Sequence, residues 1–111
     1  YVKYLEVARC ALLDKIGHNY THMVESGYAW PIIDLQLRYV RSAVFGQRLN
    51  VRASLVEWEN RLKINYLISD LQTGERLTRA SSVQVAVEVS SREMQLASPK
   101  VFTDAVERML R

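Results

Sequence analysis

The sequence predicts an α+β domain in which one long helix packs on one face of a curved antiparallel sheet and a second helix closes the chain. Three observations predict this class. The chain opens with one helical segment that carries a single apolar stripe. Strand-like runs of alternating apolar and polar residues follow it. The turns between successive runs are short, and short turns join antiparallel neighbours.

The first helix is predicted over residues 1–17. Its apolar stripe repeats at three-to-four spacing, at Leu5, Ala8, Leu12 and Ile16. Gly17 ends the helix because glycine readily adopts the positive φ angle of a helix C-terminus. A short helical turn over residues 20–25 follows, closed by Ser26 and Gly27. Near the other end of the chain, Ser98 and Pro99 suit the N-cap and first position of a closing helix over residues 100–111.

Four strands are predicted between these helices from their period-two alternation. The apolar positions are, strand by strand, Ile33, Leu35, Leu37 and Tyr39; Leu49, Val51, Ala53 and Leu55; Leu62, Ile64, Tyr66 and Ile68; and Val83, Val85, Val87 and Val89. Pro31 limits the start of the first strand to an edge or irregular position, because proline cannot donate to the ladder. The last strand is predicted to be the longest, and each strand is expected to bury its apolar face.

The connections between strands carry their own signals. Residues 42–47 form the first connection, with Gly46 as its flexible point. In the second strand the apolar phase slips between Leu55 and Val56, which predicts a β-bulge there. Glu59 and Asn60 supply the next tight turn, and residues 73–74 supply the last.

Composition and charge narrow the class of protein. The chain has 111 residues, of which 49% are apolar and 24% charged, typical of one globular domain, so we expect a single domain over residues 1–111. No apolar run approaches the roughly 20 residues of a membrane span. Cys10 is the only cysteine, which excludes an internal disulfide or a cysteine-based zinc site, and we expect it to be a small core or near-core residue. The start of the chain resembles no signal peptide, and together with the missing disulfide this favours the cytoplasm.

The net charge of +3 is too small to indicate nucleic acid, yet it is compatible with a ligand that carries phosphates. The basic residues are scattered along the chain, and no exposed aromatic set at strand spacing accompanies them. We therefore expect no nucleic-acid partner.

Two segments resemble a known family. The segment RYVRSAVFGQRLNV at residues 38–51 resembles the strand–loop–strand signature of hotdog-fold thioesterases related to hydroxybenzoyl-CoA thioesterase. The opening segment YLEVARCALLDKIG resembles that family's central helix. The resemblance continues through the WENRLK hairpin and the valine-rich strand, so it covers nearly all of the chain. Ser42 stands where the family prefers proline, and Gln47 stands where it prefers aspartate.

The resemblance implies a hotdog domain that acts as an acyl-CoA thioesterase without a cofactor, as a homodimer or homotetramer. It also implies a catalytic Asp in a loop upstream of Tyr1, so we expect the first strand and the catalytic loop to be missing from this chain. The free amides of the helix beginning near Tyr1 are then the expected oxyanion donors. Some hotdog enzymes take their carboxylate from the helix, which makes Glu6 a second candidate. The alternative is that Glu6 is a surface partner of Lys3 and Arg9.

Other side chains are candidates for binding. Arg61, Lys63 and Arg92 follow turns or strand ends where related enzymes hold the CoA phosphates, although solvated strand ends would look the same. His18 and His22 are four residues apart and could imitate a metal pair, but no third ligand lies nearby, so we expect no metal. Trp30 and Trp58 are expected to be core or dimer-contact residues.

Two classes of function remain open at this point. One is an acyl-CoA thioesterase, in which a carboxylate assists the attack of water or attacks the thioester itself. The other is a non-catalytic acyl-ligand-binding or assembly hotdog protein, since the fold alone does not establish chemistry. A nucleic-acid-binding β-sheet module is a more distant third.

Overall fold

The computed structural model describes residues 2–18, 20–39 and 48–110. The elements, in chain order, are α1 (Val2–Ile16), α2 (Tyr20–Ser26), β1 (Tyr28–Ala29), β2 (Ile32–Tyr39), β3 (Leu49–Glu57), β4 (Leu62–Asp70), β5 (Arg76–Gln84), β6 (Val87–Glu88) and α3 (Lys100–Leu110). The predicted connection at residues 42–47, with Gly46, lies outside the described residues.

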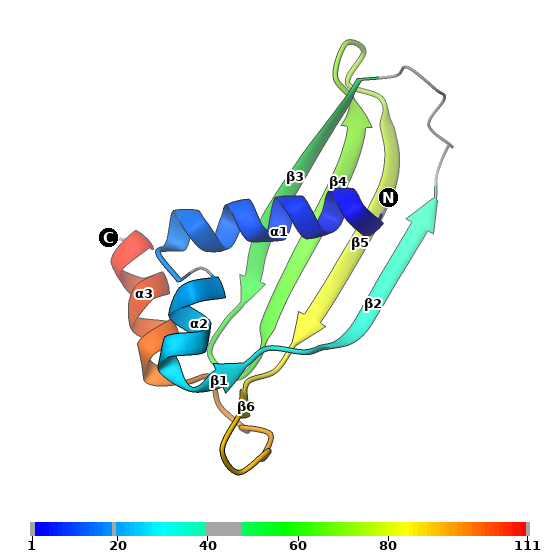
Figure 1. The fold of residues 1–111 in the computed structure, drawn as a ribbon. Helices are drawn as coiled ribbons and strands as arrows, with labels where there is room; N and C mark the ends of the chain where they lie inside the picture. The colour runs from blue at the N-terminus through cyan, green and yellow to red at the C-terminus, as the bar shows by residue number, and fades with distance from the viewer. Residues whose placement is uncertain (1, 19, 40–47, 111) are drawn as a thin grey trace.

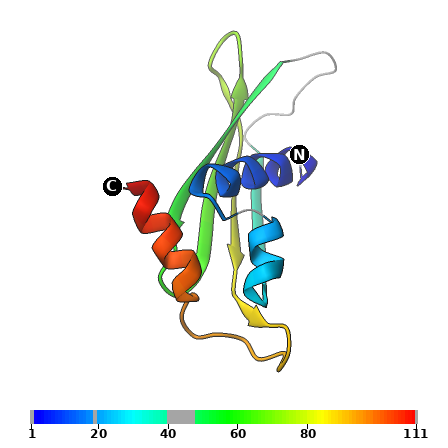
Figure 2. The same cartoon turned by 60° about the vertical axis from the view of Figure 1, so that its left-hand side comes forward.

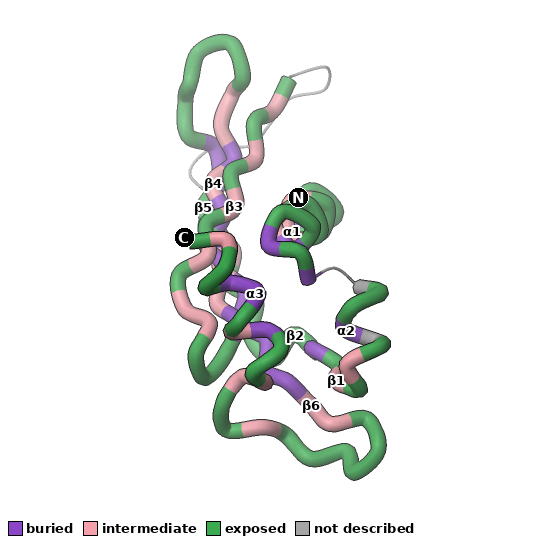
Figure 3. Tube along the Cα trace, turned by 90° about the vertical axis from the view of Figure 1, so that its left-hand side faces the viewer, coloured by how far each residue is buried: buried purple, intermediate pink, exposed green. Residues whose placement is uncertain are grey.

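The main sheet has four antiparallel strands in the order β2-β5-β4-β3, and β1 pairs with β6 in a small second sheet. Among the described strands, β2 and β3 are therefore the two edges of the main sheet. Helix α1 runs across one face of this sheet (Figure 1). The sheet is seen edge-on in Figure 3, with α1 on one side of it. This is the predicted arrangement of one long helix on one face of the sheet.

The core lies between α1 and the two central strands. Leu5, Leu13 and Ile16 of α1 are buried, and so is one whole face of β4. That face consists of Leu62, Ile64, Tyr66 and Ile68, each 3% exposed or less. Because strand side chains alternate between faces, a central strand beneath a helix buries every second residue. Phe102 and Val106 of α3 are fully buried as well, so the closing helix completes the core.

Several local predictions are confirmed. The register of β3 against β4 shifts between Leu55 and Glu57, where the bulge was expected. Gly17 and Gly74 have φ angles of 84° and 75°, values that glycine adopts without steric cost, at the end of α1 and in the β4–β5 turn. Strand β2, which begins directly after Pro31, is an edge strand.

The predicted last strand was wrong in its bounds. Strand β5 begins at Arg76 and ends at Gln84, and residues 87–88 pair with β1 instead. Four consecutive residues at this junction are buried, Val83, Gln84, Val85 and Ala86, whereas Val89 is 60% exposed. The chain leaves the main sheet here and passes through the interior. The alternating valines of the sequence therefore extend beyond Gln84, the last residue of β5, which is why the predicted strand was placed too late.

Two further expectations were also wrong. Ile33 and Leu35 of β2 are 58% and 39% exposed instead of buried, because α1 packs mainly over β3 and leaves this edge uncovered.

Ser98 does not cap α3. The carbonyl of Pro99 accepts the amides of Phe102 and Thr103, so Pro99 holds the N-cap position. The Ser98 hydroxyl is buried and has no hydrogen-bond partner among the described residues.

Candidate active site

A groove of about 780 Å³ lies between α1, α2 and the strand β1. Figure 2 shows α2 and α3 below α1, near the same end of the sheet. The apolar side chains that line the groove include Leu13, Met23 and Trp30, and its polar side chains include Arg9 and Asp14. A concave site that is mostly apolar and contains a few polar groups is typical of small-molecule binding. It suits an acyl chain better than a charged substrate.

Two polar groups at the wall of the groove are deeply buried. Gln84 and Trp30 are only 5% and 7% exposed, and the Gln84 Nε2 atom donates a hydrogen bond of 2.6 Å to the Trp30 carbonyl. The remaining Gln84 Oε1 atom and the Trp30 Nε1 atom have no hydrogen-bond partner among the described residues. Buried polar groups normally have partners.

The two tryptophans have the expected core role. The Trp30 ring packs against Phe102, with ring centroids 4.8 Å apart. Trp58 is partly buried and packs against the same core.

Cys10 was expected in or near the core, and that prediction was wrong. The thiol is exposed on α1, and Cys10 lines the groove beside Arg9. The reason is helical geometry, because Cys10 is two residues from both Ala8 and Leu12 and so lies about 200° around the helix from either.

The N-terminus of α1 is the expected oxyanion site. Tyr1 itself lies outside the described residues, and the helix begins at Val2. The first amides of a helix have no intrahelical partner and lie at the positive end of its dipole. Glu6 is exposed one turn further on, about 6 Å along the axis from Val2. Glu6 does not line the groove.

Asp14 is the carboxylate that does line the groove. It lies twelve residues after Val2, which corresponds to about 18 Å along the helix axis. Hydrogen-bonded groups must lie about 3 Å from the atom they act on. Asp14 and the N-terminal amides therefore cannot act on one thioester carbonyl.

A buried hydroxyl pair lies on the sheet face that α1 covers. The Tyr66 and Ser82 hydroxyls are 2.9 Å apart, and both residues are buried. Burial raises the pKa of Tyr66, while the hydrogen bond to Ser82 and the positive charge of Arg9 act in the opposite direction. Tyr66 is therefore protonated at neutral pH and serves as a hydrogen-bonding group instead of a base.

His18 belongs to the core. It is 2% exposed, and its ring meets the ring of Phe102 edge-on at 5.4 Å. Burial lowers its pKa, and the charge of the neighbouring His22 lowers it further. The described residues contain no group of three His, Cys, Asp or Glu side chains that could hold a metal.

The three predicted phosphate ligands lie in two places. Arg61 is in the turn between β3 and β4, where its Nε atom forms an exposed ion pair of 2.9 Å with Glu57. Lys63 follows on β4, directly opposite Glu57 in the register. Arg92 is in the loop after β6, with a φ angle of 60°. None of the three lines the groove beside α1, and their role stays a prediction.

The structure gathers four other arginines that are scattered along the sequence. These residues line a second pocket of about 560 Å³, which we call the arginine pocket. The four are Arg38, Arg52, Arg76 and Arg79. Arg38 and Arg52 occupy the polar phase of their strands, which was the available signal. The expectation of scattered basic residues was wrong for these four.

Comparison with known proteins identifies the class of this fold and then its family. The fold is the hotdog fold, as predicted. A 1,4-dihydroxy-2-naphthoyl-CoA thioesterase from Synechocystis superposes with a TM-score of 0.83 at 19% identity, covering 99% of this chain and 81% of that one. A DHNA-CoA thioesterase from Staphylococcus aureus gives a TM-score of 0.82 at 23% identity, covering 99% and 75%. The chain belongs to the Thioesterase-like superfamily, whose family model matches residues 1–109.

A relative from Synechocystis, named provisionally as an esterase, is 29% identical over 105 residues. This match covers 94% of the present chain, which spans 63% of the length of that relative. Among the described residues, no helix is both long enough and apolar enough to cross a membrane.

Proposed function

We propose that this domain hydrolyses an acyl-CoA thioester to the free acid and CoA. The observation that carries the proposal is the family match over residues 1–109, which agrees with the apolar groove beside α1. In this proposal the acyl group occupies the groove.

The chemistry needs an oxyanion site and a carboxylate. We assign the first amides of α1 to the oxyanion that develops on the thioester carbonyl, because they are free and positively polarised. We assign the carboxylate to an aspartate upstream of Tyr1, as the family resemblance implies. The carboxylate removes a proton from water as the water oxygen bonds to the carbonyl carbon, and the CoA thiolate then leaves. In the alternative route the carboxylate itself attacks the carbonyl carbon and the CoA thiolate leaves, and water then hydrolyses the resulting mixed anhydride to the free acid and the carboxylate.

We further propose a homodimer or homotetramer that associates through β2. Two observations support this assembly. Among the described strands, β2 is an edge of the main sheet and has unpaired backbone groups. Ile33 and Leu35, which are on this strand, are exposed. An edge with apolar side chains is a surface that natural proteins cover.

The single cysteine has an exposed thiol, which is compatible with the reducing cytoplasm that we assign to the protein.

A second candidate function is a non-catalytic binder of acyl ligands. One observation favours it: in the described part of the chain the groove's carboxylate, Asp14, is about 18 Å along α1 from the free amides. These residues alone supply a binding site without an arranged catalytic pair.

A hydrolysis screen separates the two candidates. The protein with its upstream segment is tested against short, long and aromatic acyl-CoAs, beside a chain that starts at Tyr1. We expect turnover only with the upstream segment, and loss of turnover with little change in stability when its aspartate is changed to asparagine. Glu6→Gln is the matched variant inside this chain, and we expect it to retain activity. Full activity of the chain that starts at Tyr1, abolished by Glu6→Gln, would move the carboxylate to Glu6.

A further inference from the structure

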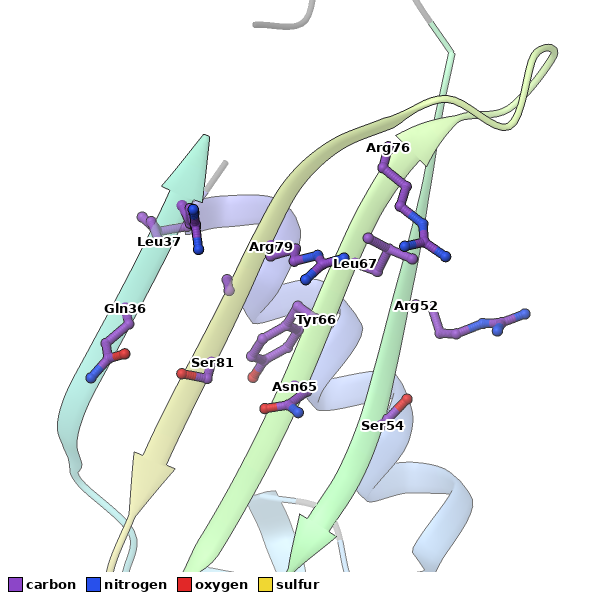
Figure 4. Close-up of a pocket in the computed structure, with 12 residues that line it drawn as sticks. Gln36, Leu37, Arg52, Ser54, Asn65, Tyr66, Leu67, Arg76, Arg79 and Ser81 are labelled. Carbon is purple, nitrogen blue, oxygen red and sulfur yellow. The ribbon is translucent and has the colours of Figure 1, made fainter. Parts of the chain in front are cut away.

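The face of the main sheet opposite α1 carries the arginine pocket. Arg79 is exposed, whereas the next residue, Ala80, is buried beneath α1, so the two side chains point to opposite faces. Figure 4 looks at this pocket with α1 behind the sheet, and Arg79, Arg76 and Arg52 are labelled there. The pocket is thus separate from the groove that we assign to the acyl group.

The strand register places three of these arginines in one row across the sheet. Arg38 on β2 lies directly opposite Arg79 on β5. Arg79 lies opposite Leu67 on β4, and Leu67 lies opposite Arg52 on β3. Side chains directly opposite one another have Cβ atoms about 5 Å apart, and like charges in such a pair are destabilising. The Arg38–Arg79 pair therefore has an unfavourable energy that a bound anion would offset.

Among the residues that the structure describes, no acidic side chain forms an ion pair with this row or with Arg76. Asp34 is in the same strand phase as Arg38 on β2, but its Oδ2 atom accepts a hydrogen bond of 3.1 Å from the Gln36 Nε2 atom. The remaining polar lining is neutral and rich in donors, with Ser54, Asn65 and Ser81.

The geometry points to a small ligand that carries a diphosphate, and we propose that the arginine pocket binds such a ligand. Its volume of about 560 Å³ lies within the range of small-molecule sites, roughly 300 to 1,000 Å³. Arginine offers a rigid fork that matches two phosphate oxygens, so a row of arginines on rigid strands suits more than one phosphate group. Because the pocket is separate from the acyl groove, and the CoA phosphates are assigned to Arg61, Lys63 and Arg92, we assign its diphosphate to a free nucleotide. The nucleotide end of CoA carries the same chemistry and is the other source that the competition experiment tests.

Titration calorimetry with inorganic pyrophosphate and with ADP, at low salt, tests this proposal. We expect the protein to bind both with a dissociation constant below about 1 mM. Arg79→Gln and Arg52→Gln should each weaken binding about tenfold or more, because each removes a charge-assisted contact. Arg108→Gln, on the exposed surface of α3, is the matched control and should bind as the wild type does. Equal binding by wild type and Arg79→Gln, or no binding by the wild type, would overturn the proposal.

Thermal unfolding gives a second measurement that a purely structural arginine would not satisfy. Without ligand, Arg79→Gln should raise the melting temperature by about 1 to 4 °C, because it relieves the repulsion across from Arg38. With pyrophosphate, the wild type should gain stability and Arg79→Gln should not. A lower melting temperature for ligand-free Arg79→Gln would contradict the repulsion on which the proposal rests.

Competition identifies the source of the diphosphate. If the nucleotide end of CoA occupies the pocket, pyrophosphate competes with acyl-CoA, and Arg79→Gln weakens binding of acyl-CoA but not of the matching acyl-pantetheine. If a free nucleotide is the ligand, ADP and acyl-CoA bind together. Binding of a single-stranded RNA oligomer without any binding of pyrophosphate would overturn the proposal in favour of a nucleic-acid surface. These are binding measurements, so they stand even if no hydrolysis is found.

Discussion

The Tyr66 and Ser82 hydroxyls form a hydrogen bond of 2.9 Å between β4 and β5, on the sheet face that α1 covers. Ser82 is only 1% exposed, so Tyr66→Phe leaves its hydroxyl buried without this partner. We expect a loss of about 1 to 3 kcal/mol in the free energy of unfolding, measured by urea denaturation. The double variant with Ser82→Ala should recover part of the loss. Strictly additive effects of the two changes would show that the hydroxyls are not coupled.

His18 makes the fold sensitive to mild acid. Its pKa is lowered in the folded state by burial and by His22, so the unfolded chain binds the proton more readily. Neutral His18 contributes fully to the free energy of unfolding above its pKa in the unfolded chain, about 6.5. This contribution is lost as the pH falls through its pKa in the folded protein. Urea denaturation between pH 7.5 and 5.5 should show this decline, and His18→Gln should flatten it. A constant free energy of unfolding in the wild type across this range would refute the prediction.

Leu35 tests the proposed assembly. It is exposed on the edge strand β2, on the face where its neighbours in β5 are buried. Light scattering at micromolar concentration should give a mass above one chain for the wild type. Leu35→Arg should raise the dissociation constant at least about tenfold, or 1.4 kcal/mol. Leu96→Arg, at a loop residue that is 86% exposed, is the control and should leave the mass unchanged.

Arg61 and Arg92 remain the predicted ligands of the CoA phosphates beside the thioester site. If they act there, Arg61→Ala and Arg92→Ala should raise KM for acyl-CoA and leave kcat nearly unchanged, because the contacts are equal in ground and transition states. The expected loss in the free energy of acyl-CoA binding is about 1 to 3 kcal/mol. For Arg61 the net loss is smaller, because in the wild type a phosphate has to compete with Glu57 for the guanidinium group. Steady-state kinetics at low salt, with Arg108→Ala as the control, would show unchanged KM values if these residues are not involved.

The sequence predicted most local features that depend on a few neighbouring residues, although it placed the N-cap of α3 one residue too early. The bulge near Leu55, the turn at Gly74 and the end of α1 at Gly17 all follow from residue type and alternation. It could not predict which apolar faces are covered. Leu35 and Ile64 occupy equivalent phases of similar alternating runs, yet only Ile64 is buried, because the position of α1 over the sheet decides this.

The arginine pocket shows the same limit for a site. Arg38 and Arg79 are 41 positions apart in the sequence and meet only because β2 pairs with β5, a contact between strands that are not consecutive. No local pattern contains that pairing. Asp14 likewise enters the groove through the arrangement of α1 and α2, whereas its sequence neighbours gave no sign of a site.

The thiol of Cys10 provides a chemical reporter of the groove. It is the only cysteine of the chain, it is exposed, and it lines the groove. Alkylation by iodoacetamide therefore gives a signal from one known atom, with no need for any catalytic turnover. A ligand that fills the groove shields this atom and slows the labelling, so acyl-chain preference becomes measurable as a series of protection rates even in a protein that hydrolyses nothing.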